Sequence, residues 1–493
     1  MTITTDVLFR HPDRLFIDGE WVSPAGGTSI AVVDSTTEEV FLRVGEANAA
    51  DMDRAVGAAR RAFDDGPWPR LTPAERAAYL RAFADGWRRH AKSVEQLWPR
   101  ETGVVARAAL RSAERGIKEW EDTADLVESF PFTEVMMPGN GGAFGLVRWE
   151  PVGVVAAITP WNAPMPSLTH KVAPALLAGC TVILKTAPEA PGEGLLAAQI
   201  AEDIGLPPGV LNVVAADRQV SELLVRDPRV DKISFTGSTA VGRRIASLCG
   251  DRVARYSLEL GGKSVAVILD DADIAQTAAT ISAAECMLTG QVCFSLTRLV
   301  VLERQHDAFV DALASAFSGV KVGDPYADGT QMGPLASEQQ RRRVEGYISA
   351  GVAQGARLVT GGGRPQDLDR GYFVEPTVFA RVDNDHTIAR EEIFGPVLSV
   401  IPAANEASAI RIANDTIYGL NASVFTGDPE RALQVAAQLR TGTVGHNAVR
   451  SDLTLGFGGF KQSGVGREGG VQGLRLFLES KAVILDGIPS SHA

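Results

Sequence analysis

From residue 151 onward the chain alternates short apolar runs with longer segments of helical character, and this rhythm constrains its fold more than any other feature. The runs cover residues 152–158, 181–184, 210–215 and 232–235, with helical segments of about 12 to 17 residues between them. Short buried strands that alternate with helices are typical of parallel βαβ units. The sequence therefore predicts an α/β fold built on a parallel sheet.

A second series of apolar runs predicts a second α/β domain. The chain has 493 residues, which is enough for two or three domains. We place the boundary near Gly261 and Gly262. The runs of the second series cover residues 264–269, 298–302, 397–401, 423–426 and 443–447.

The part of the chain before the first series is mostly helical in pattern. Residues 16–22 alternate around a turn and predict a small hairpin. Apolar spacing predicts two amphipathic helices within residues 51–90 and a further helix over residues 93–129. Residues 131–150 predict a hairpin that leaves the domain, and the β-type run 480–485 is available to pair with it.

Composition and charge exclude several classes of function. Residues are 45% hydrophobic and 22% charged, and no run of 18 apolar residues predicts a membrane span. A net charge of −12 argues against nucleic acid or an anionic membrane as a partner, although backbone amides can still bind a small anion. Residues 1–11 lack the pattern of a signal peptide. Four scattered cysteines predict neither disulfides nor a metal site, and we expect a cytoplasmic protein.

Residues 235–242 join a predicted strand to a predicted helix and are a candidate phosphate site. Gly237 and Gly242 give the spacing G-x-x-x-x-G, and Gly237 permits a tight turn. Ser238 can cap the helix, whose free amides suit a pyrophosphate. An ordinary turn between a strand and a helix would look the same.

Polar residues also follow the first two predicted strands, at the end where ligands bind in open parallel sheets. Asn162 ends the run Thr159-Pro160-Trp161-Asn162, where its amide could donate to a developing oxyanion or form an Asx turn. Lys185 could donate to ribose hydroxyls or phosphate, or be a solvated lysine.

Three further residues complete the set of candidates. In segment 391–397, Glu392 could bind ribose hydroxyls and Phe394 could back a nicotinamide ring, although a charged helix end is the plainer interpretation. Cys293 follows a Gly-Gln pair, and a cysteine is the most nucleophilic common side chain, although many cysteines are simply buried apolar residues. Glu259 is a carboxylate that could activate a water near it.

Taken together, these segments resemble the aldehyde dehydrogenase superfamily over essentially the whole chain. The resemblance is specific because many motifs occur in the same order. They are TPWN (159–162), LK (184–185), FTGST..G (235–242), LELGGK (258–263), GQVC (290–293), GPL (333–335), EEIFGPV (391–397), YGL (418–420) and FGGFKQSGVGRE (457–468).

The resemblance implies catalytic roles for three residues. Cys293 would attack the aldehyde carbon, and Asn162 with the backbone N–H of Cys293 would form the oxyanion hole. Glu259 would activate the water that hydrolyses the resulting thioester. The expected reaction is oxidation of an aldehyde to its acid, and the expected partner is a small-molecule aldehyde.

The resemblance also implies a dinucleotide site in a Rossmann-like domain. Ser238 and the amides near Gly237 would hold pyrophosphate, whereas Lys185 and Glu392 would hold the two riboses. Glu189 follows Pro188, which stands where many NAD-using relatives carry a Glu; we expect NAD, with NADP as the alternative. The full cofactor set is Thr159, Pro160, Trp161, Lys185, Glu189, Gly237, Ser238, Gly242, Leu260, Glu392 and Phe394.

We expect a substrate pocket that is less aromatic than in many relatives. The segment 445–447 lacks their Trp, Ala163 stands where several carry a Phe, and His170 stands where some carry a Trp. No Arg is placed to hold a substrate carboxylate, so we expect a medium-sized apolar aldehyde, aliphatic or aromatic. The predicted pocket residues are Ala163, His170, Val292, Phe294 and Phe457.

By resemblance, the chain divides into a cofactor domain, a catalytic domain and a small β flap for oligomerisation. We assign residues 1–130 and 152–261 to the NAD(P)-binding domain, 262–479 to the catalytic domain, and 131–151 with 480–493 to the flap. A homodimer or homotetramer is expected.

Three alternative functions stay open. A CoA-acylating dehydrogenase usually lacks the acid that matches Glu259. A cofactor-independent cysteine esterase or thioesterase would not need the turn at 237–242 or Glu392. A non-catalytic structural protein would have no use for an intact Cys293, Glu259 and Asn162.

Overall fold

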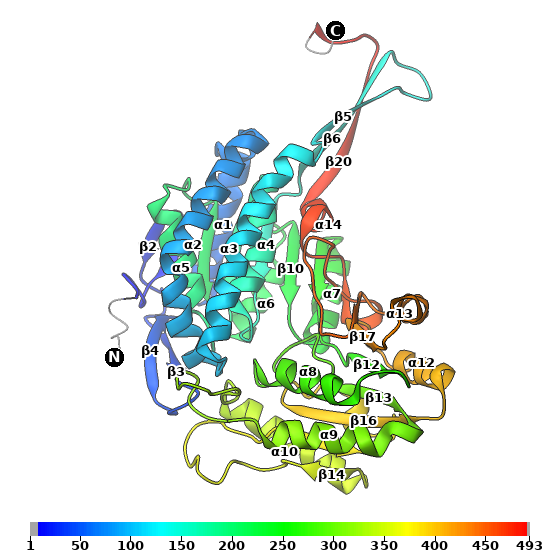
Figure 1. Ribbon diagram of the computed structural model, residues 1–493. Coiled ribbons are helices and arrows are strands. Elements are labelled where there is room, and N and C mark those ends of the chain that lie inside the picture. Colours follow the sequence, from blue (N-terminus) through cyan, green and yellow to red (C-terminus); the bar gives the residue numbers. More distant parts are fainter. Residues whose placement is uncertain (1–7, 491–493) are drawn as a thin grey trace.

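The computed structural model describes residues 8–490, and its first large unit is an eight-stranded mixed sheet (Figure 1). The five central strands, β11 to β9, are parallel, and the outer strands are antiparallel. In spatial order the strands are β19 (Gly464–Val465), β11 (Arg255–Glu259), β10 (Lys232–Thr236), β7 (Val154–Ile158), β8 (Thr181–Thr186), β9 (Leu211–Ala215), β1 (Leu15–Ile17) and β2 (Glu20–Val22).

Helices cover both faces of this sheet because successive side chains of each strand point to opposite faces. Val155 and Ala157 of β7 pack with helices α2 to α5, whereas Val154 and Ala156 pack with α1, α6 and α7. The helices are α1 (Ala49–Asp64), η2 (Trp68–Arg70), α2 (Pro73–Thr102), α3 (Ala106–Ser129), α4 (Pro164–Ala178), α5 (Gly192–Asp203), α6 (Arg218–Arg226) and α7 (Thr239–Arg252).

The predicted helix over residues 93–129 is wrong at its start, because α2 continues to Thr102 and α3 begins at Ala106. The break lies at Gly103, which ends α2 in the left-handed conformation with φ +79°. A Cβ on Gly103 would lie 2.0 Å from the carbonyl oxygen of Pro334. A distant segment of the chain therefore sets this helix end, which only glycine can occupy.

The second unit is a seven-stranded sheet, as the second series of apolar runs predicts. Its strands, in spatial order, are β14 (Arg357–Thr360), β15 (Thr377–Ala380), β16 (Val397–Ala403), β13 (Arg298–Leu302), β12 (Val265–Ile268), β17 (Asn421–Phe425) and β18 (Thr443–His446). Its helices are α8 (Ile274–Cys286), η3 (Glu303–Gln305), α9 (His306–Ser318), α10 (Glu338–Ala353), α11 (Thr387–Arg390), α12 (Glu406–Asn414) and α13 (Pro429–Ala436). The predicted class, two α/β units with a small β flap, is confirmed.

A three-stranded antiparallel sheet projects from the body as an arm (Figure 1). It contains β5 (Thr133–Met136), β6 (Phe144–Pro151) and β20 (Leu478–Leu485), and β20 pairs with β6 along its whole length. The expected pairing of run 480–485 with the hairpin is thus confirmed. Residues 491–493 of the predicted flap lie outside the described range, as do residues 1–7. A separate two-stranded hairpin consists of β3 (Ser29–Val33) and β4 (Val40–Gly45).

The C-terminal part of the chain returns from the second unit to the first. After η4 (Lys461–Ser463), strand β19 pairs with β11 at the edge of the eight-stranded sheet, and α14 (Gly470–Arg475) packs on α3 and α4. Residues 464–475, which we predicted as part of the second domain, therefore lie against the first. Ser463 links the two units where the chain passes between them. Its hydroxyl donates to the Gly261 carbonyl at 2.7 Å and accepts from the Gly419 N–H at 2.9 Å.

Candidate active site

The segment that carries Cys293 is a loop between α8 and β13 whose path is fixed by backbone conformation. Thr289 and Gly290 both adopt positive φ, +57° and +67°. A Cβ on Gly290 would lie 2.3 Å from the backbone of Gly395, so only glycine allows the two segments to approach so closely. This contact brings the motifs at 290–293 and 391–397 together.

Gln291 holds this loop in place through both ends of its buried amide. The NH2 group donates to the carbonyls of Thr102 at 3.1 Å and Leu288 at 3.3 Å, and the amide oxygen accepts from the Ala336 N–H at 2.9 Å. The loop is thereby tied to the end of α2 and to the start of the segment before α10. Our sequence reasoning gave Gln291 no role, and its place two residues before Cys293 was the one available signal.

Cys293 and Glu259 come together at the boundary between the two sheets. Glu259 is the last residue of β11 and is buried, and its carboxyl group lies close enough to the Cys293 thiol for each to affect the pKa of the other. Burial, followed by the neighbouring Glu259 and Glu392, raises the pKa of the Cys293 thiol well above its ordinary value. Of the four cysteines, Cys293 alone is partly exposed, and Cys180, Cys249 and Cys286 are buried.

A buried group of charges lies beside Glu259. Burial and then Glu468 raise the pKa of Glu259 well above its ordinary value, and Lys171 partly opposes this rise. Lys171 is fully buried and pairs with Glu468. Although burial opposes the change, Lys171 and His170 lower the pKa of Glu468 to about 2, so this carboxylate stays charged.

His170, a predicted pocket residue, belongs to this charged group. Its Nε2 lies 2.8 Å from a Glu119 oxygen, and its Nδ1 lies 3.7 Å from Glu468. Although burial opposes the change, Glu119 and Glu468 raise the pKa of His170 to about 9, which makes it an imidazolium at neutral pH. The residue is thus a cation held between two carboxylates.

Asn162 lies next to the cysteine loop, at the turn between β7 and α4. Its side-chain NH2 donates to the carbonyl of Gln291 at 2.9 Å, and its own carbonyl accepts from the Trp98 indole N–H at 3.2 Å. The amide has two N–H bonds, and this contact uses one of them. The second N–H has no hydrogen-bond partner among residues 8–490.

The predicted cofactor residues gather at the carboxyl edge of the eight-stranded sheet. Burial lowers the pKa of Lys185 to about 8, and the charges of Glu189 and Asp217 partly offset this. Glu189 is itself exposed. Thr159 joins the edge through its N–H, which donates to the Lys185 carbonyl at 3.1 Å. The Thr236 hydroxyl, at the end of β10, is buried without a hydrogen-bond partner among the described residues.

The N-terminus of α7 begins at this same edge. Ser238 caps the helix, because its hydroxyl accepts from the Val241 N–H at 3.4 Å. Gly242 leaves room for the Leu260 side chain, since an added Cβ would lie 2.5 Å from it. An added Cβ on Gly237 would lie 2.5 Å from the Phe235 ring. The first amides of α7 therefore point toward the edge where Lys185 and Thr236 lie.

Glu392 and Phe394 reach this region from the second sheet. A carboxylate oxygen of Glu392 accepts from the Gly262 N–H at 3.0 Å, and burial raises the pKa of Glu392 to about 7. Phe394 has φ +63° and meets Trp161 edge-on with ring centroids 5.4 Å apart. Pro160 lies between Thr159 and Trp161 in the same turn.

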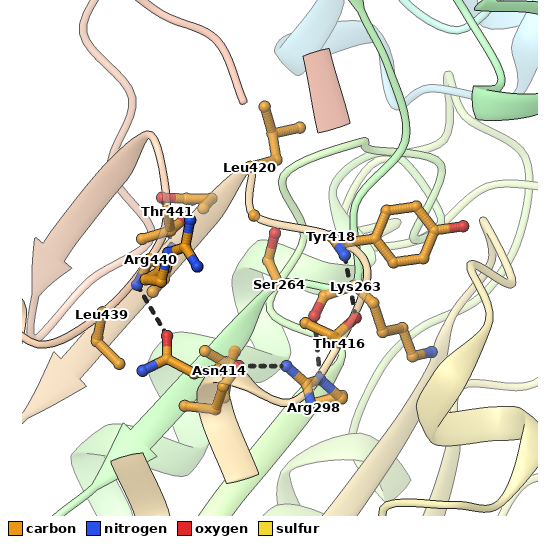
Figure 2. A pocket seen from close by; sticks show the side chains of 15 residues that line it. Lys263, Ser264, Arg298, Asn414, Thr416, Tyr418, Leu420, Leu439, Arg440 and Thr441 are labelled. Carbon is orange, nitrogen blue, oxygen red and sulfur yellow. Dashed lines mark hydrogen bonds between the residues drawn. The ribbon is translucent and has the colours of Figure 1, made fainter. Parts of the chain in front are cut away.

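Two buried basic residues, Arg298 and Lys263, line a small cavity in the second unit (Figure 2). Arg298 donates to the carbonyls of Lys263, Ile412 and Ala413 and so satisfies its guanidinium. Lys263 has no partner for its amine among the described residues, and burial lowers its pKa to about 7. A cavity of about 20 Å³ beside them has room for one water molecule.

The remaining predicted pocket residues flank the cysteine. Phe294 and Phe457 meet edge-on with ring centroids 5.8 Å apart. Val292 directly precedes Cys293, and Ala163 follows Asn162 at the start of α4. Between residues 8 and 490, no cluster of three His, Cys, Asp or Glu side chains is arranged to hold a metal ion. No helix in that range combines the length and apolar character that crossing a bilayer requires.

The parallel sheet, the helix N-terminus at its carboxyl edge and the cysteine–carboxylate pair define an α/β enzyme that places a nucleophile beside a nucleotide-type turn. The sequence model of the aldehyde dehydrogenase family matches residues 21–483, and the chain belongs to that family.

Characterised relatives and solved structures agree with this assignment. The geranial dehydrogenase of Castellaniella defragrans is 42% identical over 476 residues, which are 96% of this chain and 99% of the relative. A Mycobacterium tuberculosis aldehyde dehydrogenase solved with NAD+ is 42% identical, with a TM-score of 0.94 over 96% of this chain and 98% of the other. A cysteine-to-alanine mutant of Pseudomonas syringae aldehyde dehydrogenase C, solved with NAD+ and octanal, is 39% identical, with a TM-score of 0.93 over 97% and 98%.

Proposed function

We propose that this chain oxidises a medium-sized apolar aldehyde to the carboxylic acid with NAD+. The observation that carries the proposal is the position of the Cys293 thiol beside the buried Glu259 carboxyl group, in a loop whose Gln291 carbonyl accepts a hydrogen bond from the Asn162 amide. A nucleophile, a proton acceptor and an oxyanion donor are the three groups that acyl transfer through a thiol requires.

The first step is addition of the Cys293 sulfur to the aldehyde carbon. The thiol must first lose its proton, which can pass to solvent water, because the thiolate is the nucleophile. The carbonyl oxygen becomes an oxyanion, which Asn162 and the Cys293 N–H stabilise. When bound, NAD+ would supply the hydride acceptor that this oxidation requires.

Glu259 then activates the water that attacks the thioester. Burial raises the pKa of Glu259 above its ordinary value, which makes it a stronger base than a solvated carboxylate, and the Lys171 ammonium partly opposes this rise. The presence of Glu259 favours water over CoA as the group that accepts the acyl chain, because CoA-acylating dehydrogenases usually lack this acid. The cofactor-independent esterase reaction is disfavoured because it leaves the edge formed by Lys185, Thr236 and α7 without a use.

The residues at the sheet edge fit a dinucleotide by their chemistry. The Thr236 hydroxyl is an unpaired buried group beside the capped N-terminus of α7, where a pyrophosphate would accept hydrogen bonds. Lys185 and Glu392 supply one donor and one acceptor for ribose hydroxyls. Glu189, close enough to Lys185 to affect its pKa, would disfavour the 2′-phosphate of NADP.

The substrate class rests on the aromatic pair beside the cysteine and on the relatives. Phe294 and Phe457 give the pocket an apolar wall, and the positive charge of His170 is neutralised by Glu119 and Glu468. The names of two relatives refer to geranial and octanal, which are both apolar aldehydes. A third relative, from a Pseudomonas species, is a 3-succinoylsemialdehyde-pyridine dehydrogenase, so an aromatic aldehyde also belongs in the test.

The arm of β5, β6 and β20 supports assembly into a homo-oligomer. Val135, Met136, Met137 and Ile484 are exposed apolar residues on this arm. Exposed apolar residues on a projecting sheet favour contact with a second copy of the chain. The division into cofactor domain, catalytic domain and flap belongs to the same proposal.

An aldehyde panel tests the function directly. Octanal, geranial, benzaldehyde and succinic semialdehyde would be assayed by the absorbance of reduced cofactor, with NAD+ and NADP+ in parallel. We expect the highest kcat/KM with octanal or geranial, at least a tenfold preference for NAD+, and no turnover by Cys293→Ala. Activity confined to succinic semialdehyde would refute the substrate class, and a tenfold preference for NADP+ would refute the cofactor assignment.

A further inference from the structure

A groove of about 600 Å³ lies between α3, α8, α9 and the segment that follows α9. This volume is typical of a small-molecule site. Its described lining includes neither Cys293 nor any other residue of the candidate active site. The lining residues are Arg107, Arg111, Ala279, Ser282, Ala283, Ala284, Cys286, Met287, Ala316, Val320 and Gln331.

Two arginines on one face of α3 give this groove its charge. Arg107 and Arg111 are four positions apart, so their side chains lie side by side along the helix. Arg107 donates to the Thr330 carbonyl, and Arg111 has one polar contact, with the Met287 sulfur at 3.9 Å. Over residues 8–490, neither forms an ion pair with a carboxylate, and the lining of the groove contains no acidic residue.

The lack of carboxylate partners for Arg107 and Arg111 is notable because Asp and Glu outnumber Lys and Arg in this chain, 60 to 48. Arg115, one turn further along α3, is paired with Glu119 at 3.0 Å. Arg107 and Arg111 are exposed at the groove, and most of their N–H donors have no partner among residues 8–490. Two adjacent guanidinium groups are suited to a carboxylate, which they can bind through paired hydrogen bonds.

The other side of the groove is apolar. Ala279 and Ala283 on α8 face Ala316 on α9 and Val320 beyond it, and these small side chains leave space between the helices. A ligand that fits must therefore carry one anionic end and an apolar body. An inorganic anion would leave the apolar walls unused, and a neutral hydrocarbon would leave both guanidinium groups without a partner.

We propose that this groove binds a small carboxylate with an apolar tail, at a site separate from the catalytic cysteine. The chemical class is that of a medium-chain fatty acid. Cys286 and Met287 line the groove at the end of α8, and the same chain segment continues through Gly290 to Cys293. The proposal rests on the charges and shape of the groove and does not depend on the reaction assigned to Cys293.

Calorimetric titration of octanoate into the full-length protein tests the proposal. The Arg107→Gln/Arg111→Gln double variant removes both charges and keeps the length of the side chains. Arg115→Gln is the matched control, because it removes a charge from the same helix outside the groove. Octan-1-ol, which has the apolar body without the carboxylate, is the control ligand.

We expect octanoate to bind the wild-type chain and the Arg115→Gln variant equally, and the double variant at least tenfold more weakly. We expect octan-1-ol to bind at least tenfold more weakly than octanoate. Equal octanoate affinity in all three proteins would place the ligand elsewhere, such as at the catalytic site, and overturn the proposal. Equal affinity for the alcohol would overturn recognition of the carboxylate. If the double variant does not fold by circular dichroism, Arg111→Gln alone replaces it, with an expected loss of at least threefold.

Discussion

Replacing Glu259 with glutamine separates the two parts of the proposed reaction. The amide has nearly the same shape as the carboxyl group, so the packing at the end of β11 is retained. It cannot accept a proton, however, either from the Cys293 thiol or from a water molecule. Because the Glu259 carboxyl group lies beside the Cys293 thiol, either role is open to the wild-type carboxylate, and the variant shows which one limits turnover.

The expected size of the effect is that of a general base. Steady turnover should fall about 10²- to 10⁴-fold. At 1.36 kcal/mol for each factor of ten, this is about 3 to 5 kcal/mol of lost transition-state stabilisation. A fast burst of about one reduced cofactor per active subunit should remain, because thioester formation precedes the attack of water.

The pH dependence of the burst supplies a second readout. The neighbouring Glu259 is one of the charges that raise the pKa of the Cys293 thiol. Its removal should therefore lower that pKa and move the rise of the burst rate to lower pH than in the wild-type enzyme. Stopped-flow absorbance of reduced cofactor measures both amplitude and rate, and Cys293→Ala is the control that should give no burst.

Two results would contradict this reasoning. A Glu259→Gln enzyme without a burst would show that the carboxylate is needed earlier, to deprotonate Cys293. An unchanged steady rate would remove Glu259 from the mechanism and favour a CoA-acylating reaction with a different acceptor.

Three further substitutions give distinct outcomes. Gln291→Ala loses three hydrogen bonds that position the cysteine loop, so kcat should fall about 10- to 100-fold with little change in KM for NAD+, measured by steady-state kinetics; an unchanged kcat would contradict the positioning role. Lys185→Met should raise KM for NAD+ at least tenfold while the burst amplitude at saturating cofactor is kept, and an unaltered KM would remove Lys185 from the cofactor site. Burial raises the pKa of Glu193 from 4.5 to about 7, so stability is lost as pH rises through this range. Glu193→Gln should match the stability of wild type near pH 5. At pH 8 it should have the higher Tm, because its free energy of unfolding should be larger by up to about 3 kcal/mol; a lower Tm at pH 8 would mean that the ionised carboxylate stabilises the fold.

The two sheets could be predicted from the sequence because parallel strands are buried on both faces and appear as continuous apolar runs. The end of α2 could not, because the helical pattern continues past Gly103 and the carbonyl of Pro334 determines the break. The same holds for residues 464–475, whose return to the first sheet depends on pairing with β11. Local patterns thus predict elements well, whereas ends and crossings depend on distant partners.

In the candidate site, too, residue types could be interpreted from the sequence, whereas properties set by distant partners could not. The residue types of Cys293, Glu259 and Asn162 suggest their chemistry directly, and Asn162 follows a predicted strand. The charged state of His170 could not be foreseen, because its partners Glu119 and Glu468 lie far away in the sequence. A histidine that the sequence presented as a plain pocket residue is an imidazolium in the fold.

The two hydrogen bonds of Ser463 between the units affect how the protein unfolds. Its hydroxyl joins the Gly261 carbonyl, at the end of one sheet region, to the Gly419 N–H, at the start of a strand in the other. Because the chain crosses between the units here and β19 then completes the edge of the first sheet, neither unit is a contiguous module. The two halves should melt in a single cooperative transition, and a chain cut at residue 261 would give fragments that each lack a neighbour needed for folding.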